Sequence, residues 1–99
     1  LPIFARRADR VMAPFVRDYV WHGIYGYSLG LGFPPDWNDC AAVIQRGVDL
    51  VLRAGMVFHI NTSLRHVGVG GVAFSETVLV TPTGTTVLTR VPRKLHVAD

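Results

Sequence analysis

Only one cysteine, Cys40, occurs among the 99 residues, so the chain cannot form an internal disulfide bond. No Cys-x-x-Cys or His-x-x-His spacing suggests a zinc site, and we interpret Cys40 as a small core residue. The scarcity of cysteine fits a reducing compartment, and we expect a cytoplasmic protein. No apolar run is long enough to cross a membrane, and the first residues lack the order of a signal peptide. We therefore expect no membrane partner.

Charged residues are also few. They make up 17% of the chain, against 49% for hydrophobic residues, and this balance argues against disorder. The net charge is +3, and the basic residues form two small clusters: Arg6, Arg7 and Arg10, and Arg90, Arg93 and Lys94. No stripe of interleaved aromatic and basic residues is present, so we expect no nucleic-acid partner. The apolar share is high for a small domain, which indicates surface that other polypeptide normally covers.

The spacing of apolar residues predicts one helix followed by strands. Phe4, Ala8 and Met12 recur at helical spacing, and Pro14 removes an amide donor, so we predict a helix over about 3–13 and leave open an extension to 18. Further apolar runs predict strands at 26–31, 50–52, 56–61, 67–81 and 85–89, with turns between them. Residues 19–24 are interpreted as a short strand or a loop, and 41–45 as a short apolar patch. Within 67–81 the alternation slips at Gly70–Gly71, which suggests a bulge. The predicted fold class is α+β, with an N-terminal helix packed on a curved, mainly antiparallel sheet.

The stretch Gly26–Trp37 combines three glycines, two prolines and three aromatic residues. The glycines allow the backbone to lie close against another element. Pro34 and Pro35 restrict the chain and force a rigid exit from the preceding strand. We predict a strand that leads into a loop at a pocket. In that loop, Asp36 and Trp37 form either a substrate lip or a stiff structural turn.

Three blocks of sequence look like a known family: GYSLGLGFPPDW (Gly26–Trp37), AGMVFHI (Ala54–Ile60) and FSETVLVTPTG (Phe74–Gly84). In this order and spacing they resemble the C-terminal half of a pita-bread catalytic domain, a family that includes methionine aminopeptidase, aminopeptidase P, prolidase and creatinase. The resemblance covers about residues 3–95. It implies that residues 1–99 are the C-terminal portion of a pita-bread hydrolase domain, and a fragment of a longer chain. The missing N-terminal half would then be a partner in the fold.

The resemblance also implies a changed metal site. Metalloenzymes of this family bind two metals through two aspartates, one histidine and two glutamates, and the aspartates would lie upstream of residue 1. The histidine position falls on Tyr27 and the glutamate positions fall on Asn61 and Ser75, while a second histidine position falls near Pro34. Neutral phenol, amide and hydroxyl groups are poor replacements for anionic or imidazole ligands. We therefore expect no metal and no cofactor.

The amino-acid sequence of the three blocks resembles one branch of the family in particular, which includes ectoine hydrolase. The dipeptides Phe58-His59 and Ser75-Glu76 look like that branch, whereas Asn38-Asp39 stands where Gly-Glu is expected. This branch and creatinase hydrolyse C–N bonds of small cyclic or amidino compounds, and creatinase does so without metal. The resemblance thus implies a small-molecule substrate.

Two residues are candidates for proton transfer and five for substrate binding. His59 suits acid–base catalysis, although an imidazole in a strand is often structural. Glu76 interrupts an apolar strand and is either a base of raised pKa or an ion-paired group, with an arginine as its partner. The residues expected to bind substrate are Tyr27, Asn61, Ser75, Asp36 and Trp37. Tyr27 has a second interpretation, as a half-buried strand aromatic.

Other residues are interpreted as structural. We expect His22 and His66 to be surface or loop histidines. Gly68–Gly71 lacks the strand–turn–helix frame of a phosphate loop and is interpreted as a bulge.

Two hypotheses of different kinds remain. In the first, the parent chain is a metal-independent hydrolase of small amides or cyclic compounds, and this fragment alone is inactive. In the second, the fold is a non-catalytic relic that serves as a binding or dimerisation module. A metal-dependent Xaa-Pro peptidase is a third possibility. The exposed inner sheet face also predicts a homo-oligomer.

Overall fold

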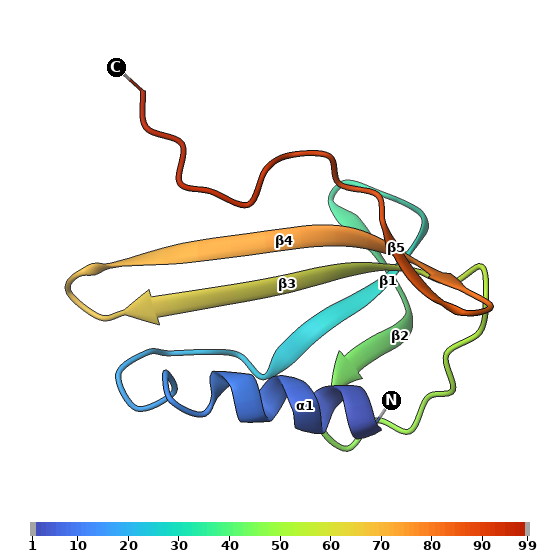
Figure 1. Cartoon of the computed structure of the whole chain (residues 1–99), viewed down its shortest axis with the longest axis horizontal. Helices are drawn as coiled ribbons and strands as arrows, with labels where there is room; N and C mark the ends of the chain where they lie inside the picture. Colours follow the sequence, from blue (N-terminus) through green and yellow to red (C-terminus); the bar gives the residue numbers. More distant parts are fainter. Residues whose placement is uncertain (1, 99) are drawn as a thin grey trace.

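The computed structural model describes residues 2–98, without the side chains of residue 2 and of residues 36–40. One helix precedes five strands, and their bounds are α1 Pro2–Met12, β1 Ile24–Phe33, β2 Asp36–Gln45, β3 Val57–His66, β4 Gly70–Thr81 and β5 Gly84–Val87. The strands form one antiparallel sheet in the order β2-β1-β3-β4-β5. α1 lies along one face of this sheet (Figure 1). The predicted fold class is confirmed.

α1 forms where the sequence predicts a helix. Ala5 and Met12 on one side of it are buried against the sheet, while Arg6, Arg7 and Arg10 on the other side are exposed. The helix ends at Met12, two residues before Pro14, and residues 13–18 form turns instead of continuing it. Among residues 2–98, no helix has the length and apolar character needed to cross a membrane.

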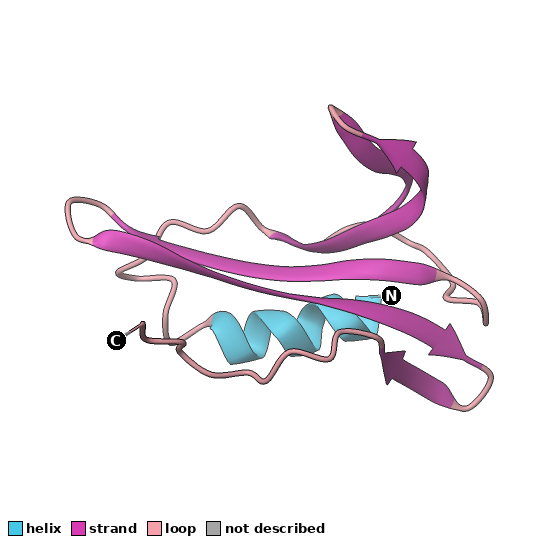
Figure 2. Ribbon diagram, turned by 90° about the horizontal axis from the view of Figure 1, so that it is seen from above, coloured by secondary structure: helices cyan, strands magenta, loops and turns pink. Residues whose placement is uncertain are grey.

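The sheet is long on one side and strongly curved on the other. β3 and β4 form a hairpin whose register is unbroken from Val57↔Leu79 to His66↔Gly70. β1 contacts β3 through only three register pairs and then follows β2. Figure 2 shows the β1–β2 hairpin curling away from the β3–β4 hairpin.

Three local predictions are wrong. The predicted loop after β1 is shorter than expected, because Pro34 and Pro35 alone form the turn. Strand β2 starts at Asp36, which pairs with Phe33 of β1, so Asp36–Cys40 belong to β2 and not to a loop. The bulge predicted at Gly70–Gly71 is not present. The break in the alternation of apolar residues marks the turn at 67–69, after which β4 begins as a new strand. Residues 50–52 form no strand: Leu50 and Leu52 pack against the core from an irregular segment, while Val51 between them is exposed.

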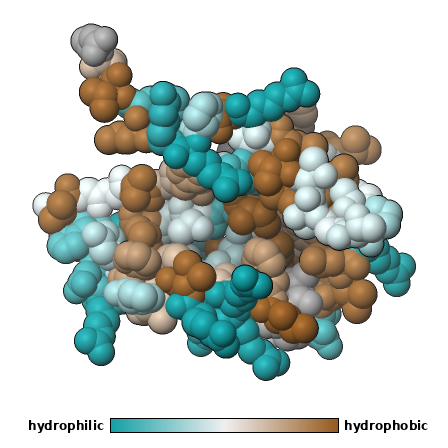
Figure 3. All heavy atoms as spheres, in the orientation of Figure 1, coloured by the Kyte–Doolittle hydropathy of each residue, from teal (hydrophilic) through white to brown (hydrophobic). Residues whose placement is uncertain are grey.

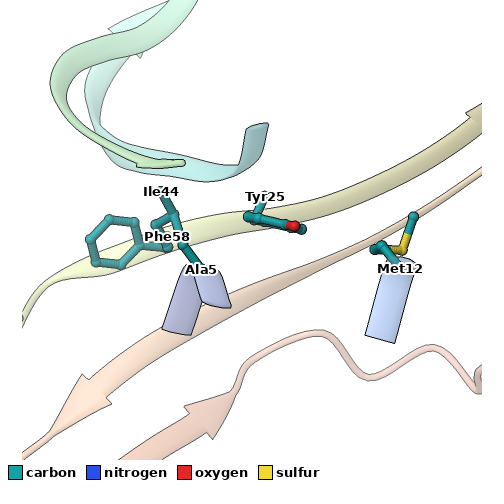
Figure 4. Packing of buried hydrophobic residues seen from close by; sticks show 5 residues of the cluster. All are labelled: Ala5, Met12, Tyr25, Ile44 and Phe58. Carbon is teal, nitrogen blue, oxygen red and sulfur yellow. The ribbon is translucent and has the colours of Figure 1, made fainter. Parts of the chain in front are cut away.

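A small apolar core joins α1 to the sheet. Among the described side chains, five apolar residues are buried: Ala5, Met12, Tyr25, Ile44 and Phe58. Figure 4 shows them meeting between α1 and strands β1, β2 and β3. Many other apolar side chains reach the surface, where they lie between polar patches (Figure 3). The radius of gyration of 14.7 Å exceeds the value of about 13 Å that is usual for a compact domain of this size.

A hydrogen-bonded group fastens α1 to the sheet. The Tyr25 hydroxyl donates to Asp9 Oδ1, and Arg46 Nε donates to Asp9 Oδ2 at 2.9 Å. The pairing of β1 with β2 shifts register between Ile24 and Gly26, and at this irregularity the Tyr25 side chain lies on the helix side of the sheet. The Arg46 and Tyr25 hydrogen bonds lower the pKa of Asp9, while burial raises the pKa of Tyr25.

The lowered pKa of Asp9 predicts an acid-sensitive contribution to stability. Because the folded state favours the carboxylate, this contribution is fully present above the ordinary pKa of about 4 and is lost as the pH falls through the lower folded value. Asp9→Asn should therefore flatten the decline in the free energy of unfolding below about pH 4, and should cost about 1 kcal/mol at neutral pH. Urea unfolding of both proteins between pH 2 and 7, about the range over which a carboxyl titrates, measures this. The exposed Asp49→Asn is the matched control, and an equally steep acid decline in Asp9→Asn would contradict the prediction.

Candidate functional site

The two faces of β3 carry different side chains. Phe58 and Ile60 pack in the core beneath α1, so the alternate residues His59 and Asn61 lie on the opposite face. Residues paired across antiparallel strands share a face, and the register places Tyr27 beside His59 and Ser75 beside Asn61. We call these four residues the polar face. The sheet thus brings together His59 and three of the five residues predicted to bind substrate.

Tyr27 and His59 form the closest pair on the polar face. Their ring centroids are 5.1 Å apart and the ring planes are tilted by 37°. Both side chains are half-buried. The preceding residue, Gly26, pairs with Ile60, and β1 comes so close there that a Cβ on Gly26 would lie 2.5 Å from the carbonyl oxygen of His59. The close approach predicted for the glycines of this stretch is confirmed at this position.

Two polar side chains next to this pair on β3, Asn61 and Ser63, have buried atoms without a hydrogen-bond partner among the described residues. Asn61 Oδ1 is buried and has no hydrogen-bond partner among the described residues, and the same holds for Ser63 Oγ, two residues further along β3. Leaving such an atom unpaired costs about 1–3 kcal/mol, so each is a candidate for a contact with a ligand or with covering polypeptide. Ser63 was missed in the sequence, although it follows His59 and Asn61 in the same alternation.

Glu76 lies on the other face of the sheet. It pairs with Ile60, which packs beneath α1, and it lines a hollow of about 260 Å³ together with Phe4 and Val78. Arg93 Nε donates to Glu76 Oε1 at 2.7 Å. Hydrogen bonds from Arg93 and Thr89 hold the pKa of Glu76 below its ordinary value.

The two alternatives for Glu76 are thereby separated: it is the ion-paired group and not a base of raised pKa. His59 and Glu76 also cannot share one substrate across this sheet, because their side chains point to opposite faces. Grouping them in one catalytic site is therefore corrected. Arg93 lies in the segment after β5, and only the tertiary structure identifies it as the partner.

The ligand positions implied by the resemblance do not fit a pair of metal ions. They carry Tyr27, Asn61 and Ser75, which offer neutral oxygen and nitrogen atoms where hard divalent cations need carboxylates or imidazole. Among the side chains that the structure describes, no group of three His, Cys, Asp or Glu residues gathers. No step of a reaction is therefore assigned to a metal held by these residues.

The remaining predicted residues lie apart from the polar face or outside the described side chains. His22 is exposed, as expected for a surface histidine. His66 is instead the half-buried last residue of β3, and its ring packs edge-on against Tyr19 with the ring centroids 5.5 Å apart. The side chains of Asp36, Trp37 and Cys40 lie outside the described residues, so their predicted roles stay predictions.

Comparison with known proteins gives consistent matches. A model of metallopeptidase family M24 matches residues 5–82. Ectoine hydrolase of Halomonas elongata is 33% identical over 72 residues, which make up 73% of this chain and 18% of that protein. A protein of Sinorhizobium fredii described as an uncharacterized hydrolase/peptidase is 36% identical over 83 residues, or 79% of this chain and 21% of that protein. Xaa-Pro dipeptidase of Pyrococcus horikoshii is 30% identical over 93 residues, or 94% of this chain and 26% of that protein.

The chain thus spans about a fifth to a quarter of the length of these relatives. No solved structure gives a significant match.

Proposed function

Because the chain belongs to metallopeptidase family M24, we propose that it forms one wall of a site that hydrolyses C–N bonds of small amide or cyclic compounds. The relatives are named as hydrolases or peptidases, and a hydrolase-like domain follows from them. The finer proposal is that this site works without metal, and that the remainder of the site comes from polypeptide beyond these 99 residues. The chain by itself would then turn over no substrate.

One observation carries the proposal. The rings of Tyr27 and His59 lie in tilted contact, with centroids 5.1 Å apart, on the face of the sheet away from α1. Next to them is Asn61, whose buried Oδ1 has no partner among the described residues. A proton-transfer group thus stands beside hydrogen-bonding groups on the face of the sheet away from α1. This combination suits a polar substrate better than it suits packing, because a packed face would be apolar.

The chemistry assigned to these residues is an addition of water followed by loss of nitrogen. The His59 imidazole accepts a proton from the attacking water as a C–O bond forms at the amide or amidine carbon. It then donates that proton to the leaving nitrogen as the C–N bond breaks, so the enzyme returns to its starting state. Tyr27, Asn61 and Ser75 hold the substrate through hydrogen bonds, and the Asn61 amide offers both a donor and an acceptor.

The names of two relatives suggest different substrates. Ectoine hydrolase points to a small cyclic compound, and Xaa-Pro dipeptidase points to a dipeptide. The neutral residues at the ligand positions favour the first, since they supply no carboxylate to hold metal.

Chelation of metals distinguishes the two. In the longer protein that contains residues 1–99, turnover of ectoine or a related cyclic amidine should persist after exhaustive treatment with EDTA. A metal-dependent Xaa-Pro dipeptidase treated in parallel is the control and should lose its activity. Manganese-stimulated cleavage of an Xaa-Pro dipeptide by the longer protein would instead support the metal-dependent alternative, and absence of turnover with every amide or ring substrate would refute the hydrolase.

A second candidate function is a binding or dimerisation module. The small core and the many exposed apolar side chains favour it, because such surface is normally covered. In the same experiment, complete lack of turnover together with a dimer in light scattering would support this module, whereas an inactive monomer would leave it without support.

A further inference from the structure

β1 holds one residue more than β2 near its start. Ile24 pairs with Gln45 and Gly26 pairs with Ile44, so β1 advances by two residues between these pairs while β2 advances by one. Two residues against one is the pattern of a β-bulge, in which the extra residue bends the strand and redirects the side chains around it. Tyr25 is the extra residue of β1.

The bulge decides which face of the sheet Tyr27 occupies. In a regular strand, residues that are two apart lie on the same face. Tyr25 is buried with Met12 on the α1 side (Figure 4), yet Tyr27 pairs with His59 on the opposite face. A slip of β1 by one residue against β3 would pair Tyr27 with Phe58 and turn its ring toward the core. The contact between Tyr27 and His59 therefore depends on a single register.

A carboxylate on α1 fastens both strands at this bulge. Asp9 Oδ1 accepts a hydrogen bond from the Tyr25 hydroxyl, and Asp9 Oδ2 accepts one from Arg46 Nε at 2.9 Å. Arg46 directly follows Gln45, the β2 partner of the residue before Tyr25. Tyr25 is 4% exposed and the Asp9 side chain is 19% exposed, so their hydrogen bond lies largely out of water, where it is stronger.

The Tyr25 ring by itself does not fix the register. It is in tilted contact with the Trp21 ring, with centroids 4.7 Å apart, and it lines an apolar hollow together with Met12 and Ile60. Apolar packing of this kind is non-directional and tolerates small shifts, whereas a hydrogen bond requires a defined distance and angle. The hydroxyl, more than the ring, therefore selects one position of Tyr25.

We propose that Tyr25 is a positioning residue, which acts through its hydrogen bond to Asp9 and holds β1 in the register that sets Tyr27 beside His59. Both Tyr25 and Asp9 lie on the α1 side of the sheet, so they act on the polar face only through the backbone of β1. This inference rests on the proposed function for its consequence, which is that a displaced Tyr27 no longer holds the substrate beside His59. The register itself exists without substrate and can be measured without it.

NMR spectroscopy of the chain tests the register. Tyr25→Phe and Asp9→Ala each remove the hydrogen bond and should weaken the nuclear Overhauser effect between the rings of Tyr27 and His59. The reason is that loss of a hydrogen bond to a charged group shifts an equilibrium by about 10-fold or more. An undiminished effect between these two rings in both variants would overturn the proposal.

Three controls separate a local slip from a general loss of structure. The Overhauser effect between Phe58 and Val78, which pair on β3 and β4, should stay unchanged and shows that the variants are folded. Tyr19→Phe removes a hydroxyl from the segment between α1 and β1 and should leave the contact of Tyr27 with His59 intact. Asp9→Asn keeps an acceptor for the Tyr25 hydroxyl and should also retain the contact. Its loss in Asp9→Asn would assign the register to the ion pair with Arg46 and overturn the role of Tyr25.

Turnover by the longer protein tests whether Tyr25 acts through Tyr27. Tyr25→Phe should lower kcat/KM, and it should cause little further loss when it is added to Tyr27→Phe, because both substitutions remove the same contact with the substrate. Losses that add in full in the double variant would show that Tyr25 does not act through Tyr27 and would overturn the proposal.

The two measurements also separate this proposal from the proposed hydrolase. If no substrate is turned over but Tyr25→Phe loses the contact between Tyr27 and His59, the hydrolase fails and the positioning role stands. If a substrate is turned over and Tyr25→Phe alters neither the contact nor kcat/KM, the positioning role fails and the hydrolase stands.

Discussion

Replacing His59 with glutamine in the longer protein should lower kcat for C–N hydrolysis by about 10²–10⁴-fold, the usual contribution of a general acid–base residue. Glutamine keeps a polar side chain of similar size but cannot carry a proton between water and the leaving nitrogen. Tyr27, Asn61 and Ser75 remain in place beside it, so KM should change much less than kcat. Steady-state kinetics with the substrate identified for the longer protein gives both constants.

His96→Gln provides the matched control, because His96 lies in the exposed segment after β5 and away from the polar face. It should leave both kcat and KM unchanged. A fall of kcat in His59→Gln by less than about 10-fold would remove His59 from the proton-transfer role. An equal rise of KM and no change of kcat would make it a binding residue.

Replacing Gly26 with alanine should destabilise the chain by about 1–3 kcal/mol, or more if the strands cannot move apart. The added Cβ would meet the carbonyl oxygen of His59 at 2.5 Å and the Ile60 side chain at 3.0 Å. The first contact is with backbone, so β1 and β3 must separate to relieve it. The gain of about 0.4–1 kcal/mol from a stiffer unfolded chain is smaller than this penalty. Urea unfolding followed by circular dichroism measures the difference.

Gly84→Ala is the control for this substitution, since a Cβ at Gly84 meets no atom within 4 Å. It should change stability by no more than about 0.5 kcal/mol. Equal stability of Gly26→Ala and Gly84→Ala would show that β1 and β3 are not held as closely as described. The same separation would move Tyr27 from His59, so in the longer protein Gly26→Ala should also reduce activity.

The elements with strong local signals were predictable from the sequence. The helical spacing of Phe4, Ala8 and Met12, together with Pro14, places α1 to within a residue or two. The turn at 82–83, between β4 and β5, and the strands on either side of it follow from alternation and turn chemistry. The sequence does not predict β2: residues 41–45 indicate only an apolar patch, and Asp36–Cys40 carry weak β-propensity, so their strand state depends on pairing with β1.

The candidate site was predictable in its residues but not in its grouping. The resemblance points to Tyr27, His59, Asn61 and Ser75 one by one, and strand parity then puts His59 and Asn61 on one face. Glu76 needed the structure, because a lone carboxylate in an apolar strand is equally compatible with a base and with an ion pair. The partner Arg93 is 17 residues away in the sequence and belongs to a segment without regular structure.

The sequence alone determined the periodicities, the breaks in them and the chemistry of each side chain. The α+β class follows from the periodicities, whereas the three positions without a metal-binding side chain are implied by the resemblance to the family. These properties are local, since each depends on a few neighbouring residues. Only the tertiary structure decided which side chains share a face, which polar atoms are left without partners, and that Asp9 of α1 fastens Tyr25, the extra residue of β1. Strand register and strand order bring together residues that are distant in sequence. The contacts that stabilise one register over another form only when the chain has folded, so a local pattern cannot predict them.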